Sequence, residues 1–172
     1  MNFDKISTLR PVFDKTGVVT AANSSSINDG GAALLVMSED KAKELGLKPL
    51  VEIVAQSSAA KAPIEFTTAP ADAIAKVLKK ANMKTTDIDL FEINEAFAVV
   101  SLAVNKILNL DARKINVNGG AVALGHPIGA SGARILVTLI YEKMRQNLKY
   151  GLASLCIGGG EASALIVKNY NS

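Results

Sequence analysis

The alternation of apolar and polar positions becomes regular from about residue 50 onward. There, short apolar runs that suit buried strands alternate with segments in which apolar residues recur every three or four positions, as on one face of a helix. The expected strands are 51–56, 88–93, 115–118, 152–157 and 162–168, and the expected helices cover 74–81, 95–108 and 130–146. The order βαβαβαββ predicts an α/β fold with a mixed, mostly parallel sheet that is covered by helices.

The first 48 residues follow a weaker pattern. Residues 1–27 end in a polar cluster and predict loop with short extended pieces, whereas the apolar run 30–37 predicts a buried strand. Ser38 then suits the N-cap of a short helix over 39–45, and Gly46 suits its end.

Composition sets limits on the class of protein. The 172 residues are 49% hydrophobic and 20% charged, which is enough apolar material for a folded core and excludes disorder as a class. A net charge of +3 and 5% aromatic residues argue against a nucleic-acid partner. The single cysteine and single histidine exclude a disulfide framework and a zinc site made from several such residues.

The sequence predicts neither a targeting segment nor a membrane segment. Residues 1–6 lack the apolar region of a signal peptide, and no run approaches the ~18 apolar residues of a membrane helix. We therefore expect a protein without membrane contact, in the cytoplasm.

The first of three polar strand ends begins at Asn94, in the sequence Asn-Glu-Ala-Phe-Ala that follows strand 88–93. Asn94 is a good helix N-cap, and Glu95 in the first turn would suit the helix dipole. Alternatively, the Asn94 amide could hold a water molecule that donates a hydrogen bond into a pocket. Because chemistry gathers at the carboxyl ends of strands in such sheets, we expect the three strand ends to face one edge.

The second strand end leads into the glycine-rich stretch 119–132, which contains His126. Pro127 disfavours helical geometry at His126 and so places the imidazole on a loop. The stretch matches neither a P-loop nor a dinucleotide-binding fingerprint. His126 could be a structural residue with satisfied hydrogen bonds, but a histidine on such a loop also suits proton transfer near neutral pH.

The third strand end carries Cys156, followed by Gly158, Gly159 and Gly160. A single cysteine is usually an inert core residue. Here the backbone N–H groups of the glycines could form a nest for a developing oxyanion. The thiol could exchange a proton with a substrate carbon or act as a nucleophile.

Taken together, the motifs at 94–97, 125–132 and 156–160 resemble the carboxy-terminal half of a thiolase. Asn23-Ser-Ser25 and Asn28-Asp-Gly30 extend the resemblance, which is strongest toward the acetyl-CoA acetyltransferases. It implies that an acyl group moves from acyl-CoA to a nucleophilic cysteine and then condenses with acetyl-CoA, or that the reverse thiolysis runs.

The resemblance also implies roles for individual residues. His126 would help to activate the nucleophile and donate a hydrogen bond to the thioester oxygen of acetyl-CoA, and Asn94 would hold a water that completes this oxyanion hole. Cys156 would be the acid/base for the α proton, and the N–H of Gly158 would contribute to a second oxyanion hole.

The same resemblance implies how coenzyme A would be held. Ser25, Ala96 and Phe97 match positions that line the pantetheine channel of the family. The substrates would be coenzyme A thioesters such as acetyl-CoA and acetoacetyl-CoA, and no further cofactor is expected. A role in fatty acid metabolism follows from the same comparison.

The family layout predicts how the chain divides. Residues 1–27 would be the tail of a loop region, 28–48 a strand and helix that belong to an absent amino-terminal domain, and 49–172 a whole carboxy-terminal domain. Thiolases carry their nucleophilic cysteine in the amino-terminal half, so we expect the chain to be inactive alone. Its exposed apolar face would need an amino-terminal half or a second copy.

Two other functions stay open at this point. The chain could be a non-catalytic half-thiolase that binds an acyl-CoA or merely persists as a fragment. It could also be a thioester hydrolase in which Cys156 is the nucleophile and His126 its base.

Overall fold

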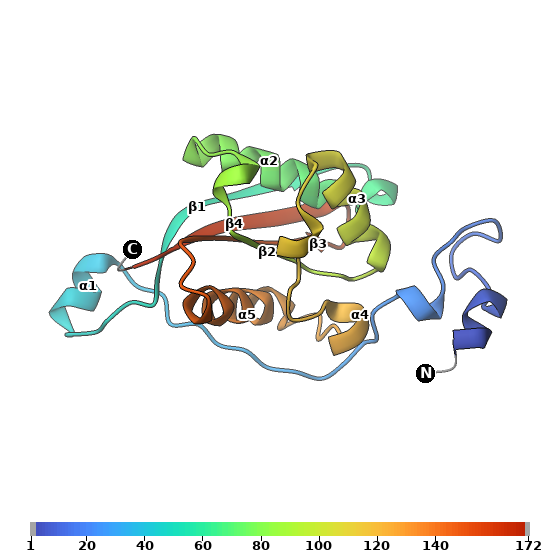
Figure 1. Ribbon diagram of the computed structural model, residues 1–172, viewed down its shortest axis with the longest axis horizontal. Helices are drawn as coiled ribbons and strands as arrows, with labels where there is room; N and C mark the ends of the chain where they lie inside the picture. The colour runs from blue at the N-terminus through green and yellow to red at the C-terminus, as the bar shows by residue number, and fades with distance from the viewer. Residues whose placement is uncertain (1–2, 171–172) are drawn as a thin grey trace.

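The computed structural model of the protein describes residues 3–170, in which one four-stranded sheet has helices on both faces (Figure 1). The strands are β1 (Val51–Ala60), β2 (Leu90–Ile93), β3 (Tyr150–Ile157) and β4 (Glu161–Asn169), in the spatial order β1-β4-β3-β2. The helices are α1 (Glu39–Glu44), α2 (Ala69–Ala81), α3 (Ala98–Leu108), α4 (Ala121–Leu124) and α5 (Ser131–Arg145). Short 3-10 helices cover Phe3–Thr8, Ala21–Asn23, Pro63–Glu65, Thr85–Asp87 and Ala112–Lys114.

The sheet is mixed, as predicted, but it is not mostly parallel. Only β2 and β3 pair in parallel, whereas β3–β4 and β4–β1 are antiparallel. The reason is the short connection after β3, which reverses the chain at Gly159 and Gly160 with φ values of +96° and +99°. This left-handed geometry suits glycine, and a two-strand reversal is necessarily antiparallel.

The predicted strand at 115–118 is wrong. Ile115 makes a single parallel bridge with Phe91, after which Asn116 adopts a left-handed φ of 48° that ends the extended backbone. The Asn116 side chain takes over the pairing: its Oδ1 accepts from the Ile93 N–H and its Nδ2 donates to the Ile93 carbonyl, both at 2.8 Å.

The predicted buried strand at 30–37 is also wrong. The segment is extended but has no strand partner within the described residues, and Leu35 is 82% exposed. An apolar run becomes a strand only where it pairs with another strand. Among the described residues, neither edge strand of the sheet, β1 or β2, pairs with residues 30–37. The following helix is confirmed as α1, with the Ser38 hydroxyl accepting from the Lys41 N–H at 3.2 Å.

Two apolar layers hold the sheet between its helices. On one face α2 and α3 pack against the sheet, and on the other face α5 does so (Figure 1). Ile74 and Val77 of α2 and Ile135 and Leu139 of α5 are almost completely buried. Side chains of this size each stabilise a fold by about 1.5–3 kcal/mol on full burial. No helix in the described part of the chain has both the length and the apolar character needed to cross a membrane.

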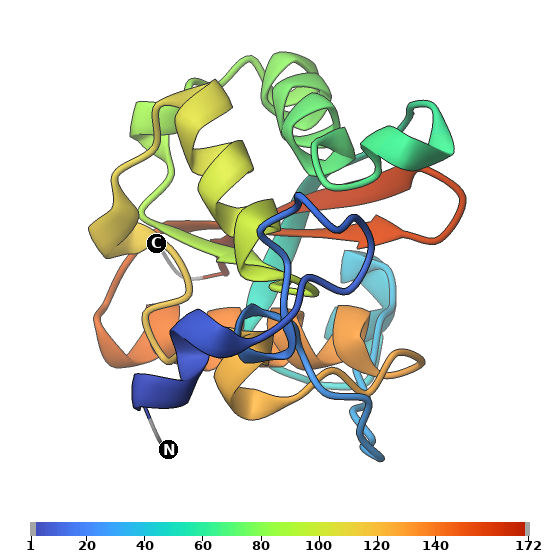
Figure 2. The ribbon, with the colours of Figure 1, turned by 90° about the vertical axis from the view of Figure 1, so that its right-hand side faces the viewer.

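The amino-terminal segment lies at the end of the sheet where β2 and β3 finish. In Figure 2 the blue segment runs between α3 above and the orange α4–α5 region below. It then continues beneath α5 to reach α1 (Figure 1). The segment therefore lies across the edge at which the polar strand ends were expected to meet.

Candidate functional site

The fold brings Asn94 and His126 together from positions 32 residues apart, with Asn94 Nδ2 lying 3.4 Å from His126 Nε2. Asn94 follows β2, and its N–H donates to the Ser154 carbonyl on β3 at 2.9 Å. The side chain is buried, and its Oδ1 has no hydrogen-bond partner among residues 3–170. An amide oxygen left unpaired in this way is costly, so it suits a bound polar group.

His126 lies on the loop between α4 and α5, as the sequence predicted. Its Nδ1 is 2.6 Å from the hydroxyl oxygen of Ser131, the first residue of α5. Burial, and secondarily the charge of Arg134, lower the pKa of His126 below its usual 6.5. The imidazole is therefore mainly neutral at pH 7, the form in which one ring nitrogen can accept a proton.

The segment 24–28 holds the Asn94 and His126 loops against each other. The backbone N–H and the hydroxyl of Ser25 donate to the Ala96 carbonyl at 3.0 and 2.8 Å. At the next residue, the Ser26 carbonyl accepts from the His126 N–H at 3.0 Å, and the same N–H lies 3.3 Å from Asn28 Oδ1. One short stretch therefore fixes the backbone of both loops.

Asn28 was not predicted as a site residue, although the stretch that contains it was part of the family resemblance. Its carboxamide fills the space beside Gly125, where a Cβ would lie only 2.3 Å from Asn28 Oδ1. Gly125 also has a φ of +94°. The residue before the histidine is thus restricted to glycine by both conformation and space, which sequence alone signals only as a glycine-rich loop.

Cys156 lies near the end of β3, beside the end of the parallel strand β2, so the two strand ends share one edge. The thiol is half-buried, and burial raises its pKa. Among the described residues, no hydrogen bond joins it to Asn94 or His126. A thiol in this state is protonated at neutral pH and suits acid/base exchange better than direct nucleophilic attack.

The other predicted residues occupy different surroundings. Gly158 is exposed in the turn from β3 to β4, and nothing lies within 4 Å of the place where a Cβ would be. Phe97 makes edge contacts with the rings of Phe13 and Phe66 at centroid distances of 5.5 and 5.9 Å. The Ala96 carbonyl is engaged by Ser25. These contacts give Phe97 and Ala96 packing roles, and a role in binding coenzyme A stays a prediction for them.

A buried charged pair, which the sequence analysis missed, lies next to the site. Glu92 on β2 is 3% exposed, and its Oε2 is 4.0 Å from Nη1 of Arg134 on α5. Burial raises the pKa of Glu92 to about 7, more than the nearby guanidinium lowers it. Glu92 lies two residues before Asn94. In the sequence, the only indication of its burial is that it is a charged residue within a short apolar strand.

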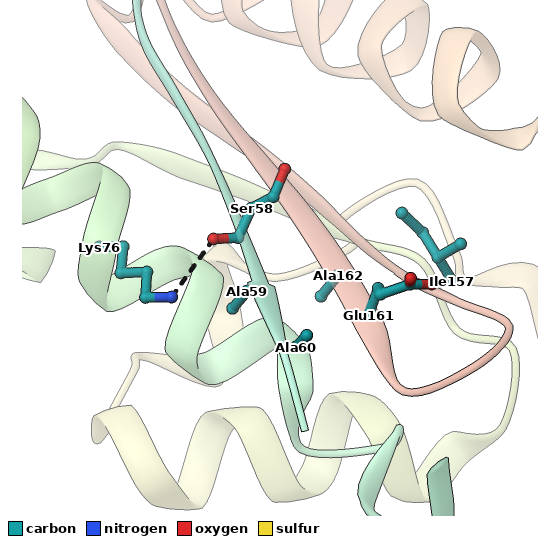
Figure 3. A pocket seen from close by; sticks show the side chains of 7 residues that line it. All are labelled: Ser58, Ala59, Ala60, Lys76, Ile157, Glu161 and Ala162. Carbon is teal, nitrogen blue, oxygen red and sulfur yellow. Dashed lines mark hydrogen bonds between the residues drawn. The ribbon is translucent and has the colours of Figure 1, made fainter. Parts of the chain in front are cut away.

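Neither of two surface hollows contains the Asn94–His126 pair. One lies where the end of β1 meets the start of β4, next to the β3–β4 hairpin. There Lys76 Nζ donates to the Ser58 carbonyl at 3.4 Å (Figure 3). The other measures about 800 Å³ and is a mainly apolar groove between residues 33–53 and α5. Nowhere within residues 3–170 do three His, Cys, Asp or Glu side chains converge as a metal would require.

Comparison with known proteins identifies the fold that carries this site. Residues 47–169 match the family model described as "Thiolase, C-terminal domain", and residues 1–40 match "Thiolase, N-terminal domain". A probable acetyl-CoA acetyltransferase of Dictyostelium discoideum is 58% identical over 96% of this chain and 40% of its own length. A probable acetyl-CoA acyltransferase of Staphylococcus aureus is 54% identical over 99% of this chain and 43% of its own length.

Solved structures agree. The acetyl-CoA acetyltransferase of Bacillus anthracis superposes with a TM-score of 0.92 at 53% identity, covering 96% of this chain and 42% of that one. Human mitochondrial 3-ketoacyl-CoA thiolase in complex with CoA gives 0.90 at 43% identity, over 98% and 43% of the two chains. The chain spans about 40% of the length of these relatives. It corresponds to their carboxy-terminal part, and with this fold and these matches it belongs to the thiolase family.

Proposed function

We propose that this chain supplies the carboxy-terminal catalytic elements of an acetyl-CoA acetyltransferase. The observation that carries the proposal is the Asn94–His126 pair, with an unpartnered amide oxygen on one side and a mainly neutral imidazole on the other. The names of the relatives supply the reaction class. The substrates would be acetyl-CoA and acetoacetyl-CoA.

His126 and Asn94 would act on the thioester oxygen. Loss of an α proton from acetyl-CoA places negative charge on that oxygen, so donors aimed at it lower the barrier to forming the enolate. His126 Nε2, once protonated, would donate one hydrogen bond, and a water held by the Asn94 amide would donate a second. The imidazole would also accept the proton of the nucleophilic cysteine in the acyl-transfer step.

Cys156 would exchange the α proton. A thiol whose pKa is raised by burial is a stronger base once ionised, which helps it to remove a weakly acidic C–H proton. The enolate carbon would then attack the acyl group on the nucleophilic cysteine, and that cysteine would leave as a thiolate. The N–H of Gly158 would stabilise the charge on the acyl oxygen during this attack.

The coenzyme A chain would pass the edge formed by Ser25, Ala96 and Phe97. Ser25 and Ala96 are joined by two hydrogen bonds, which keeps this edge in a fixed shape. A cytoplasmic location and a role in fatty acid metabolism stay predictions from the sequence.

An amino-terminal half would bind the apolar groove between residues 33–53 and α5. Leu35 and Val36 are 82% and 68% exposed on an extended segment without strand partners among the described residues. Unpaired extended backbone with apolar side chains fits addition to the edge of another sheet. The nucleophilic cysteine would come with that sheet, since Cys156 is the single cysteine of this sequence.

The test is complementation. The chain is mixed or co-expressed with the amino-terminal part of a relative that carries the nucleophilic cysteine, and thiolysis of acetoacetyl-CoA is measured. Activity is expected only in the mixture, and His126→Ala or Cys156→Ala should lower it by at least about 10²-fold. The exposed substitution Lys79→Met is the matched control and should leave activity unchanged.

The other candidate functions predict different outcomes. Binding of coenzyme A in calorimetry without rescue by any amino-terminal half would identify a non-catalytic module. An acetyl adduct on the chain alone, seen by intact mass and absent in Cys156→Ser, would identify a hydrolase. Either result would overturn the proposal.

A further inference from the structure

Ser131 is the one side chain that contacts the inner ring nitrogen of His126 in the described part of the chain. Its hydroxyl oxygen lies 2.6 Å from His126 Nδ1 and 3.0 Å from the Pro127 carbonyl oxygen. The side chain is completely buried, so water does not compete for these two bonds. Ser131 therefore decides what His126 Nδ1 can do.

A hydroxyl has one proton to donate, and the Pro127 carbonyl can only accept one. With the Ser131 hydroxyl donating to Pro127, its oxygen is left to accept a proton from His126 Nδ1. The remaining ring nitrogen, Nε2, then carries a lone pair, and the Asn94 Nδ2 that faces it at 3.4 Å is a donor. In the series of hydrogen bonds that runs from the Asn94 amide through His126 and Ser131 to the Pro127 carbonyl, each donor thus meets an acceptor. Hydrogen bonds aligned in this way strengthen one another.

The opposite tautomer breaks this pattern. If the Ser131 hydroxyl donated to Nδ1, the proton of His126 would lie on Nε2 and face the N–H₂ of Asn94, so that two donors would meet. The Asn94 amide would have to turn by half a revolution to restore a hydrogen bond. The two tautomers are therefore distinct states of one network.

We propose that Ser131 is a positioning residue that holds neutral His126 in the Nδ1–H tautomer, so that proton uptake and release occur only at Nε2, the nitrogen that faces Asn94. The consequence for reactivity rests on the proposed function. In the neutral state Nε2 accepts the proton of a nucleophile. In the protonated state Nε2 no longer offers the Asn94 N–H₂ an acceptor, and Nε2–H donates to an oxyanion instead. Nδ1–H donates to Ser131 in both states, so the inner bond never has to break.

The tautomer can be measured without activity. His126 is the single histidine of the sequence, so selective ¹⁵N-histidine labelling of the full chain gives one imidazole spin system. Long-range ¹H–¹⁵N spectra at pH 7.5 should show a protonated Nδ1 and an unprotonated Nε2. Free imidazole side chains in water favour the reverse, so a predominant Nε2–H form in the wild-type chain would overturn the proposal.

Substitutions separate positioning from packing. Ser131→Ala should lower the Nδ1–H fraction several-fold, whereas Ser131→Thr, which keeps the hydroxyl, should retain it. Ser154→Ala is the matched control, because Ser154 is equally buried and donates to the Ser163 carbonyl at 2.8 Å without touching His126. An unchanged tautomer in Ser131→Ala would contradict the proposal.

The assembled enzyme supplies an independent measurement. In the complementation mixture, Ser131→Ala should lower kcat with little change in KM, and Ser131→Thr should restore kcat. If the mixture is inactive but the tautomer is as stated, the proposed function fails and the assignment of Ser131 stands. If the mixture is active and the tautomer is the reverse, the assignment of Ser131 fails alone.

Discussion

At several positions near the site, the groups packed beside a residue determine which residue type fits there or how it is protonated. Gly125 has a left-handed backbone and the Asn28 carboxamide against its Cα, and Gly120 has the Glu95 carboxylate in the place where a Cβ would be. Glu92 is fixed by burial, and its carboxyl group keeps its proton up to a pH of about 7. Each of these constraints leads to a measurable effect of one substitution.

Gly125→Ala should destabilise the protein by about 2 kcal/mol or more, since a Cβ would meet Asn28 Oδ1 at 2.3 Å and φ is +94°. Urea unfolding measures the change, with Gly31→Ala, where nothing lies within 4 Å, as the control. Adding Asn28→Ala should recover only part of the loss, because it relieves the collision and not the backbone strain. Full recovery would contradict the strain argument.

Glu92→Gln should change how stability depends on pH. The native pKa of about 7 lies above the usual 4.5, so between these values the native state holds a proton that the unfolded chain releases. Wild-type stability therefore falls as pH rises through this window, by up to about 3 kcal/mol at ~1.4 kcal/mol per pH unit.

Relative to wild type, Glu92→Gln should therefore be more stable at pH 8 than at pH 5 by about 2–3 kcal/mol. Denaturant unfolding at both pH values measures the difference, with the exposed Glu65→Gln as control. Parallel pH curves for Glu92→Gln and wild type would show that the buried carboxyl does not titrate as stated.

At the scale of elements, α5 connects the site to the far end of the sheet. Ser131 in its first turn contacts His126, and Arg134 one turn later approaches Glu92. In its last turn the completely buried Lys143 donates to the Lys149 carbonyl at 2.9 Å and to the Val167 carbonyl at 3.1 Å. The helix is thus fastened at both ends by buried polar contacts, and its middle packs through apolar side chains.

Lys143→Met should destabilise the fold by about 1–3 kcal/mol, because two buried carbonyls lose a donor while the apolar stem is kept. Burial lowers the pKa of Lys143 to about 8, so part of the loss is offset by removing a buried charge. Urea unfolding measures the change against the exposed Lys79→Met on α2. Equal stability of the two variants would mean that the buried bonds contribute nothing net.

At the scale of the whole molecule, helices cover both faces of the sheet, but an apolar groove between residues 33–53 and α5 stays open. Leu35 and Val36 lie on the border of that groove. Both side chains are exposed, whereas the side chains of an apolar run are normally buried in a fold. The exposed run should make the isolated chain self-associate.

Leu35→Lys should reduce self-association of the isolated chain, because a charge on the exposed run opposes burial of that surface. It should also weaken rescue by an amino-terminal half at least about tenfold, since burying an unpaired charge is costly. Sedimentation velocity and the complementation assay measure the two effects. Ile64→Lys, at an 87% exposed position on Pro63–Glu65, is the control and should change neither.

The sequence by itself determined the identity of most elements and of the family. Apolar spacing located β1, β2, β3, β4, α2, α3 and α5, because periodicity is a local property that the chain carries wherever it is placed. The cap residues Ser38 and Gly46 located α1. The two predicted strands that are wrong, 30–37 and 115–118, would each have needed a partner strand. Residues 30–37 pair with no strand among the described residues, and at 115–118 the Asn116 side chain, instead of backbone, bonds the Ile93 backbone.

Only the tertiary structure decided which groups meet. The Asn94–His126 contact, the Ser131 bond to Nδ1 and the contacts made by residues 24–28 join positions that are 5 to 100 residues apart in the sequence. The raised pKa of Glu92 likewise comes from burial between β2 and α5 and not from the residue itself. Such contacts depend on how strands and loops are stacked in space, which no local pattern of residues encodes.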